Sequence, residues 1–331
     1  VPEYIYYCLE NDEFVKRIAR AQRGSIYPAV RVDDVFDAEI PIAPLPEQRR
    51  IVEKIEALLS DIANGVDSLN AVDRKLATYR QSVLKAGVTG ALTQSQRDGG
   101  AWSGESGQNL LNMISKKYKK PDNIDIRKSS AKLPFTLPKN WAWAALPEIG
   151  HFGRGKSKHR PRNDPSLYGG SYPFIQTGIV RSAGGHISTY SDTYNEKGLK
   201  QSKLWPAGTI CITIAANIAE TAILEFDACF PDSVVGLIPD KEVNGRFIEY
   251  FIRTVKYDLD RFAPATAQKN INLNTLYGVL VPLPPRSEQE SIVEKIEERL
   301  AGAERVNSTS DWVLDHSNTL RHSILNSAFA G

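Results

Sequence analysis

Cysteine is scarce in this chain: among its 331 residues there are three, Cys8, Cys211 and Cys229. They are scattered and lack metal-ligand spacing, which excludes a disulfide framework and indicates a reducing compartment. Long apolar runs are missing as well, since none approaches the roughly 20 residues that a membrane helix needs. We therefore expect a cytoplasmic protein with no membrane partner.

An excess of charge of either sign is also absent. Lys and Arg total 41 against 39 Asp and Glu, which leaves a formal net charge of +2. Any affinity for nucleic acid must then come from local basic patches and not from the chain as a whole. Hydrophobic residues at 41% and charged residues at 24% are ordinary for a globular protein, and the length fits about two domains.

Motifs of the common catalytic sites are missing too. The sequence has no G-x-S-x-G elbow, no H-E-x-x-H pair, no G-x-G-x-x-G after a strand, and no Asn/Asp-Pro-Pro-aromatic tetrapeptide of the adenine methyltransferases. Its histidines do not stand at ligand spacing from Asp, Glu or Cys. We predict that the chain is not an enzyme and that it binds neither a metal nor a cofactor.

One apparent exception is Gly150–Ser157, which satisfies the phosphate-loop pattern G-x-x-x-x-G-K-S. Such a loop cradles phosphates because a helix begins directly after it. Pro161 and Pro165 follow here, so no helix can begin where the phosphates require one. A nucleotide site that uses Lys156 is therefore kept only as an alternative.

The most informative feature that is present is an internal repeat, because residues 40–90 are written a second time at 281–331 with an offset of 241 residues. The copies share a proline-rich exit, a Glu-Gln pair and the hexapeptide Ile-Val-Glu-Lys-Ile-Glu, at 41–44, 47–48 and 51–56 and again at 282–285, 288–289 and 292–297. A short strand is expected before each exit, at Ile40-Pro41 and Val281-Pro282. A duplicated unit of this size points to a target that is itself bipartite.

Two long helices are predicted from the repeat, over 46–93 and 286–331. Their apolar residues recur every seven positions with companions three residues earlier, the pattern of a coiled-coil seam, which Asn307, Ser310 and Ser317 interrupt in the second helix. We expect the helices to pair, antiparallel or side by side, as a coiled-coil spacer between two domains. The alternative is an ordinary amphipathic pair in a domain core. The predicted helix-pair interface consists of Val52, Ile55, Leu59, Ile62, Leu69, Leu76, Val83, Val293, Ile296, Leu300, Leu314 and Ile324.

The remaining chain is divided by composition. Residues 94–132 are predicted to be a polar linker, because glycine and polar residues dominate there and a basic run follows. Residues 133–285 are predicted to form an α+β domain, with strands near 172–175, 209–214, 222–224 and 233–238 and a helix at 244–261. Residues 1–45 are interpreted as the C-terminal remnant of a first such domain, of which roughly 110 residues have no counterpart in the alignment of the two units. We therefore expect a fragment or a shortened version of a longer protein.

The predicted contact with nucleic acid is a loop between His151 and Arg162 that contains five Lys or Arg residues and no acidic residue. On a nearly neutral protein, such a loop is a local electrostatic footprint for a phosphate backbone. A merely solvated basic loop is the alternative. The candidate phosphate contacts are Arg154, Lys156, Lys158, His159, Arg160 and Arg162.

Candidates for contacts with base edges are polar side chains in two further segments, since Gln and Asn can pair with adenine and Arg with guanine. The segment 268–270 aligns with 27–29 of the other copy and differs from it, as expected where two different specificities are encoded. The base-edge candidates are Gln176, Thr177, Arg181, Gln268 and Asn270, and Lys269 in the same segment is a further candidate for contact with DNA.

The doubled proline-rich exit, followed by Glu-Gln and the shared hexapeptide, resembles the specificity (S) subunits of type I restriction-modification systems. Leu137–Trp141 and Gly169–Gly178 support this resemblance, which covers nearly the whole chain. It implies two target recognition domains, each of which recognises one half of a bipartite DNA sequence. It also implies two long helices that hold these domains apart and dock the modification subunits.

The resemblance further implies the partners of the chain. These are double-stranded DNA, modification subunits that bind S-adenosylmethionine and methylate adenine, and restriction subunits that use ATP and Mg to translocate and cut DNA. The S subunit itself is not catalytic. A homodimer that restores two complete recognition domains is an alternative assembly, and a coiled-coil scaffold that never contacts DNA is the competing class of function.

Overall fold

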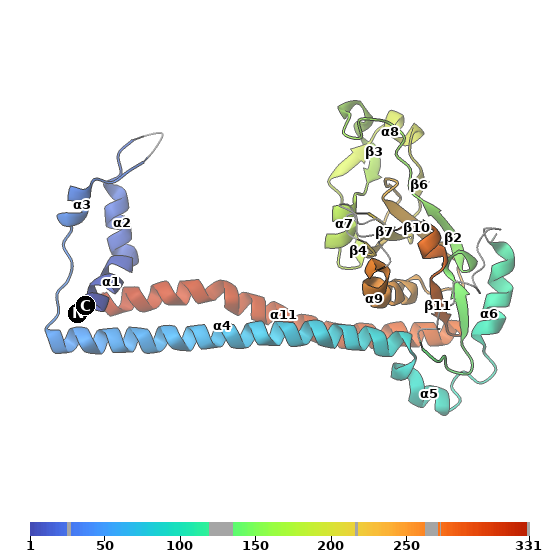
Figure 1. Cartoon of the computed structure of the whole chain (residues 1–331), viewed down its shortest axis with the longest axis horizontal. Helices are drawn as coiled ribbons and strands as arrows, with labels where there is room; N and C mark the ends of the chain where they lie inside the picture. Colours follow the sequence, from blue (N-terminus) through green and yellow to red (C-terminus); the bar gives the residue numbers. More distant parts are fainter. Residues whose placement is uncertain (25–27, 119–134, 216–217, 262–270, 272, 330–331) are drawn as a thin grey trace. The chain divides into compact units, whose positions relative to one another are not determined.

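The computed structural model describes residues 1–24, 28–118, 135–215, 218–261, 271 and 273–329. The chain divides into two compact units: unit 1 contains Val1–Tyr79 and Ala301–Gly331, and unit 2 contains Arg80–Leu300. Two helices of 44 residues each, α4 (Leu45–Val88) and α11 (Arg286–Phe329), contribute to both units (Figure 1). The α+β fold class with two long helices, predicted from the sequence, is confirmed.

Unit 1 combines three short helices with parts of the two long ones. The short helices are α1 (Pro2–Glu10), α2 (Asp12–Arg20) and α3 (Val32–Phe36). Tyr4 and Cys8 of α1 are buried together with Val52 of α4, and the ring of Tyr4 meets that of Phe329 edge to face at 5.3 Å. The N-terminal residues thus pack on the long helices of this unit.

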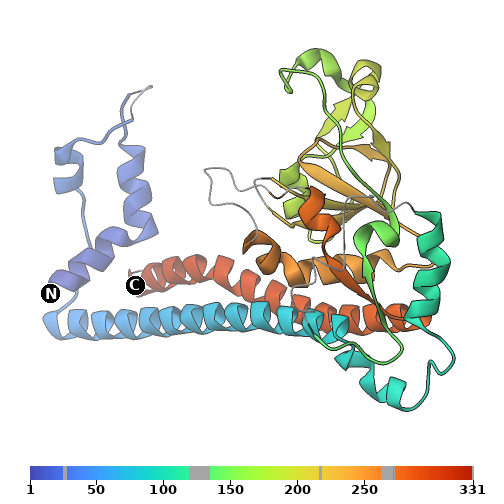
Figure 2. The ribbon, with the colours of Figure 1, turned by 45° about the vertical axis from the view of Figure 1, so that its right-hand side comes forward.

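The long helices run antiparallel in each unit. In unit 1 the first part of α4 lies beside the last part of α11, which both ribbon views show (Figures 1 and 2). In unit 2 the end of α4 packs on the start of α11, where a Cβ added to Gly87 would lie 2.5 Å from Cδ1 of Ile296. Glycine at position 87 therefore allows a close approach of the two helices.

Unit 2 holds the sheets. Its helices are η1 (Ala91–Thr93), α5 (Gln94–Asp98), α6 (Gly107–Ile114), η2 (Ser115–Lys117), η3 (Leu146–Glu148), η4 (Pro165–Leu167), α7 (Thr177–Ser182), α8 (Glu196–Lys200), α9 (Gly245–Arg261) and α10 (Leu273–Tyr277). Its strands are β1 (Ala142–Ala145), β2 (Gly150–Arg154), β3 (Tyr168–Phe174), β4 (His186–Ile187), β5 (Asp192–Tyr194), β6 (Leu204–Trp205), β7 (Ile210–Thr213), β8 (Thr221–Leu224), β9 (Ala228–Cys229), β10 (Val234–Pro239) and β11 (Leu280–Leu283). The four strands and the helix that the sequence predicts are present as β3, β7, β8, β10 and α9.

Three sheets organise these strands. The central one has the order β2-β10-β7-β8-β4, a second has the order β5-β3-β9-β6, and β1 pairs with β11. Within unit 2, α9 lies between the central sheet and the helix pair (Figures 1 and 2), and the core cluster joins Phe247 of α9 to Ile212 and Leu237 of the sheet and to Ile292 of α11. Asn244 begins α9, because its side-chain oxygen accepts from the backbone N–H of Arg246 at 3.0 Å.

The two copies of the internal repeat make equivalent hydrogen bonds in the structure. The side chain of Gln48 donates to the carbonyl oxygen of Ala43 at 2.8 Å, and Gln289 donates to Pro284 at 2.9 Å. The other end of each amide accepts from the start of a helix: Gln48 from the N-terminal amine of Val1 at 2.8 Å, and Gln289 from the backbone N–H of Asn244 at 2.8 Å. The glutamine of each Glu-Gln pair thus fixes the entry of its long helix in the same way.

Two expectations need correction. The polar linker is wrong for the part of 94–132 that the structure describes up to 118, because Leu110, Leu111 and Ile114 share one face of α6 and are buried in the core of unit 2. A strand is found at Val281-Pro282, where β1 pairs with it, but not at Ile40-Pro41, where the described part of unit 1 offers no partner strand. Residues 119–132 lie outside the described residues.

None of the helices in the described residues is both long enough and apolar enough to cross a membrane.

Candidate nucleic-acid interface

The basic loop follows strand β2 in unit 2 and is fixed by its backbone. The N–H of Gly155 donates to the carbonyl of Val234 at 2.8 Å, and that of Lys156 donates to Phe230 at 3.1 Å. The N–H groups of Lys158 and His159 both donate to the side-chain oxygen of Gln201, at 2.7 and 3.0 Å. The loop therefore presents its side chains from an anchored backbone.

This anchoring argues against the phosphate-loop alternative. A phosphate loop needs free backbone N–H groups and a helix directly behind them. Here the N–H groups of Gly155, Lys156 and Lys158 are already bound within the protein, and the next helical turn is the three-residue η4 that begins at Pro165. Glycine is required at 155 because an added Cβ would lie 2.3 Å from the carbonyl oxygen of Pro231.

Asp232 neutralises part of the predicted charge. Its carboxylate accepts from Arg162 at 2.5 Å and lies 3.9 Å from the guanidinium of Arg160, while its backbone oxygen accepts from Arg154. Asp232 lies in the turn before β10 and is 70 residues beyond Arg162 in sequence, so a local count of charges misses it. Three of the predicted phosphate contacts are therefore held by the protein itself.

A second carboxylate holds the histidine of the loop. His159 Nε2 lies 2.7 Å from Asp164 Oδ2. The pKa of Asp164 falls to about 2, chiefly because its carboxylate accepts the backbone N–H of Ser166, with a smaller contribution from His159. Asp164 thus stays ionised and keeps the imidazole turned toward the protein.

Lys156 and Lys158 are left as the available cations of the loop. Lys158 is exposed and Lys156 is half-buried, and neither ammonium group has a hydrogen-bond or ion-pair partner among the residues that the structure describes. An ammonium group without an internal partner can bind a phosphate oxygen at little cost.

A neighbouring lysine pair belongs to the same surface and was missed in the sequence. The hydroxyl of Ser202 donates to the carbonyl of Lys156 at 2.8 Å, which brings the segment with Lys200 and Lys203 next to the loop. Lys200 is exposed. The signal that could have indicated this group is the spacing of three residues between Lys197, Lys200 and Lys203.

Lys203 is held more firmly than Lys200. Its ammonium group lies 3.6 Å from the ring centroid of Trp205 and 3.0 Å from Nε2 of His151. Burial lowers the pKa of Lys203, and burial together with the nearby Lys203 lowers the pKa of His151. His151 is therefore neutral near pH 7 and accepts a hydrogen bond from the lysine.

The base-edge candidates lie on another element. Gln176 precedes α7 and donates to Asp192 at 3.1 Å, Thr177 is half-buried, and Arg181 is exposed near the end of α7. Gln176 and Thr177 make no hydrogen bond with the basic loop in the described part of the chain. The three other candidates lie outside the described residues: Gln268, Lys269 and Asn270.

The predicted helix-pair residues are buried most strongly near the ends of the helices. The buried members are Val52, Ile55, Val83, Val293 and Ile296. The half-buried members are Leu59, Ile62, Leu69, Leu76, Leu300, Leu314 and Ile324. Among the polar interruptions, Ser310 is buried, and its hydroxyl has no partner within the described residues.

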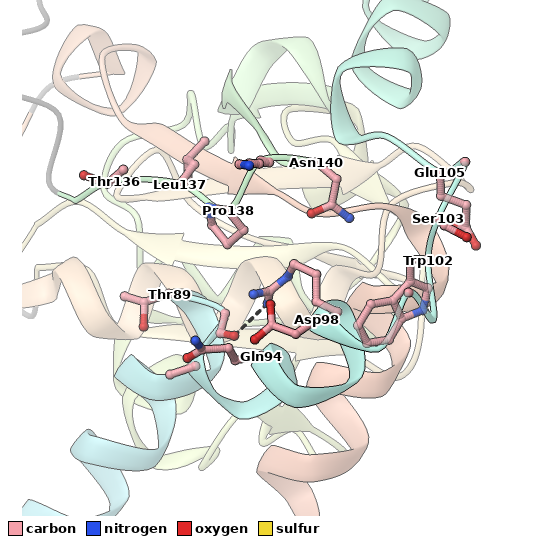
Figure 3. A pocket seen from close by; sticks show the side chains of 16 residues that line it. Thr89, Gln94, Asp98, Trp102, Ser103, Glu105, Thr136, Leu137, Pro138 and Asn140 are labelled. Atoms are coloured by element: carbon pink, nitrogen blue, oxygen red, sulfur yellow. Dashed lines mark hydrogen bonds between the residues drawn. The ribbon is translucent and has the colours of Figure 1, made fainter.

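A charged cluster at the start of α11 was also missed. Glu288 is fully buried and accepts hydrogen bonds from Thr93 at 2.9 Å, Arg97 at 2.8 Å and the indole N–H of Trp141 at 2.8 Å. Beside it lies a cavity of about 650 Å³. Figure 3 shows Pro138 on one side of this cavity, facing the residues that follow α4. The sequence shows the Glu-Gln motif. It does not show that Arg97 is the ionic partner of Glu288, because the two residues are 191 positions apart.

In the residues that the structure describes, no group of three or more His, Cys, Asp or Glu side chains could hold a metal ion. The basic surface that Lys156, Lys158, Lys200 and Lys203 form is suited to a polyanion.

Comparisons with known proteins agree with a DNA-directed role. Residues 138–302 match the family described as Type I restriction modification DNA specificity domain. The chain is 24% identical over 336 residues to the Type I restriction enzyme EcoDI specificity subunit of Escherichia coli, covering 99% of this chain and 69% of the relative. It is 27% identical over 312 residues to the EcoBI specificity subunit of the same species, covering 89% of this chain and 58% of the relative.

Solved structures show the same fold. The crystal structure of the HsdS subunit from Thermoanaerobacter tengcongensis is similar with a TM-score of 0.60 and 22% identity, covering 100% of this chain and 70% of that one. A chain from a structure of complex assembly and conformational transition of the type I R-M system is similar with a TM-score of 0.63 and 21% identity, covering 99% and 70%.

Proposed function

Because this chain belongs to the family of specificity subunits of type I restriction-modification systems, we propose that its residues 133–285 bind one half of a bipartite DNA sequence. The observation that carries this proposal is the anchored basic loop of unit 2. Its backbone is fixed by Val234, Phe230 and Gln201, while Lys156 and Lys158 remain available for phosphates. Contacts of this kind set the register of a protein on the duplex, and base contacts then supply specificity.

Base recognition is assigned to the polar residues near α7 and to the segment 268–270. Gln176 and Arg181 are exposed and have the donor groups that pair with adenine and guanine in the major groove. Gln176 has to leave Asp192 in order to do so. We also assign contacts with DNA to Thr177, Gln268, Lys269 and Asn270, on the basis of their chemistry alone.

The partners of the chain follow from the same proposal. The paired helices α4 and α11 would dock modification subunits and set the spacing between the two half-sites. S-adenosylmethionine, ATP and Mg would be bound by the modification and restriction subunits, and this chain would contribute no catalytic group. A homodimer would supply a second recognition domain.

Replacement of both free lysines of the loop tests DNA binding. For the double variant Lys156→Ala and Lys158→Ala, we expect the slope of log K against log salt to become shallower by about 1.8, because each phosphate contact releases about 0.9 counterion. A filter-binding titration of the chain on its duplex across salt concentrations measures this slope. A scaffold that never contacts DNA would instead show no retention at any salt concentration.

Lys241 provides the matched control. It is an exposed lysine of the same unit, with 82% of its side chain exposed. It follows Pro239, which pairs with Gly150 at the far end of β2 from the loop. Lys241→Ala should leave the salt slope unchanged, and an equal loss in both variants would mean that the loop is not the contact.

A measurement of nucleotide binding distinguishes the proposed DNA contact from the alternative of a nucleotide site that uses Lys156. Since the backbone N–H groups of Gly155, Lys156, Lys158 and His159 are engaged, we expect no binding of ATP by the isolated chain in equilibrium dialysis. Retention of ATP that disappears in Lys156→Ala would restore the phosphate-loop interpretation.

A further inference from the structure

Unit 1 contains an open groove between its two long helices. Its volume is about 600 Å³, and its walls are the first turns of α4 and the last turns of α11. Ile51 and Ile55 of α4 face Ile324 and Ala328 of α11 across it, and Glu47 lies at its edge. The groove is therefore lined by apolar side chains together with one carboxylate, Glu47, and two cations, Arg50 and Lys54.

The internal repeat gives this groove a counterpart in unit 2. The offset of 241 residues relates Glu47 to Glu288 and Ile51 to Ile292, and it relates Ala328 to Gly87. In unit 2 the corresponding positions are covered, since Glu288 and Ile292 are both 0% exposed. Equivalent residues thus line both copies of the groove. The copy in unit 2 is covered, and the copy in unit 1 is open.

Residues that follow α4 cover the copy in unit 2. Thr93 and Arg97 donate to Glu288 at 2.9 and 2.8 Å. The left-handed residue Gly90, with φ of 82°, turns the chain so that η1 and α5 can reach the start of α11. Leu92 packs on the core cluster that contains Ile292.

The copy in unit 1 lacks such a cover in the described residues. Glu47 is exposed and accepts no side-chain hydrogen bond from the described part of unit 1, and Ile51 is only half-buried. Glu288 is satisfied by donors of the protein and Glu47 by solvent, so the donors that cover the copy in unit 2 have no counterpart in the described part of unit 1.

We propose that the groove of unit 1 is a docking site for a polypeptide segment with the chemistry of Gly90–Asp98 of this chain. The segment makes a glycine turn, inserts one aliphatic side chain between the helices, and donates from a hydroxyl and a guanidinium to Glu47. This occupant follows from the shared walls, because a surface that repeats in sequence and geometry selects the same complement.

One difference between the copies defines the segment further. Arg50 stands where the other copy has Ser291, whose hydroxyl donates to Gln96 at 3.4 Å. A guanidinium in place of that hydroxyl favours a carboxylate opposite it. The segment that docks in unit 1 therefore has an acidic residue at the position of Gln96.

A graft onto the full chain tests the proposal. Gly331 corresponds to Gly90, so residues 91–105 are appended after it, with the change Gln96→Glu in the graft. We expect the amides of residues 47–58 to exchange hydrogen about tenfold more slowly than in the chain without the graft, because the groove becomes covered. Mass-spectrometric hydrogen exchange on both proteins measures this.

Two single changes complete the design. Glu47→Ala in the grafted chain should abolish the slowing, whereas Glu53→Ala, an exposed glutamate of the same helix outside the groove lining, should retain it. Exchange that is not slowed by the graft, or that stays slow in Glu47→Ala, would overturn the proposal. Protection that rises with the concentration of the ungrafted chain would place a second copy in the groove and would also overturn it.

Discussion

At the scale of single residues, the two glutamates of the repeated Glu-Gln pair have the same sequence context and opposite surroundings. Glu288 is fully buried and receives donors from Arg97, Thr93 and Trp141, whereas Glu47 is exposed. A buried carboxylate is tolerated only while its donors are in place, and each donor in turn depends on the carboxylate. The pair therefore offers a controlled comparison within one chain.

Glu288→Ala should destabilise unit 2 strongly. The change leaves Arg97 and the indole of Trp141 without their acceptor, and breaking a buried ion pair costs about 3 to 5 kcal/mol of unfolding free energy. Glu47→Ala should change the unfolding free energy by less than about 0.5 kcal/mol, since it is an exposed side chain. Urea unfolding followed by fluorescence compares the two, and equal midpoints would refute the role assigned to Glu288.

Asp232→Asn should make binding to duplex DNA stronger and less selective. The change releases Arg162 and Arg160 from their carboxylate. Two freed guanidinium groups should steepen the salt slope of binding by up to about 1.8. Titrations on specific and random duplexes measure both effects, and Asp227→Asn, whose carboxylate accepts the backbone N–H of Ala207 in the same unit, is the control. A slope that does not change would mean that these arginines do not reach the phosphates.

At the scale of elements, the apolar seam of α11 is interrupted by a polar residue, Ser310. Its hydroxyl is buried and has no partner in the described residues. Ser310→Ala should raise the unfolding free energy of unit 1 by about 1 kcal/mol, because an unsatisfied buried hydroxyl is removed. Ser308→Ala, an exposed change on the same helix, shares the gain in helix propensity and lacks the burial term. Thermal unfolding should therefore separate the two variants.

Elements that depend on neighbouring residues are predicted well from the sequence, and elements that depend on residues far apart along the chain are predicted badly. The long helices were predicted to within a few residues because a heptad pattern is local, as Ile55 and Ile62 illustrate. The helix α6 was missed because glycine-rich neighbours hide Leu110 and Leu111, whose burial depends on strands far away in sequence. The missing strand at Ile40 shows the same effect, since a strand forms only where another strand pairs with it.

The candidate site divides in the same way. The basic loop was visible in the sequence because its charges are consecutive. The groups that tune it, Asp232 and Gln201, come from other elements and reach the loop only in the fold. Lys203 was missed since its neighbour His151 is 52 residues away.

At the scale of the whole molecule, the proposed function predicts that the length of the paired helices sets the spacing between the two DNA half-sites. One heptad inserted into both α4 and α11 keeps their apolar faces matched and lengthens each helix by roughly 10 Å. We expect the recognised sequence to gain about three base pairs between its half-sites, at 3.4 Å per pair. Methylome sequencing of cells with the assembled complex measures the spacing. An unchanged spacing would contradict the proposed role of the helices, and a matched pair of heptad substitutions without insertion is the control.

The antiparallel pairing of α4 with α11 has a consequence for synthesis on the ribosome. Roughly 200 residues separate the end of the first helix from the start of the second, and at about 5 to 20 residues per second their translation takes roughly ten to forty seconds. Throughout that interval Val83 and Val88 lack the side chains of Ile292 and Ile296, with which they share a core cluster in the fold. The nascent chain thus exposes the apolar face of α4 during this interval. Chaperones that bind aliphatic segments can bind α4 during that time.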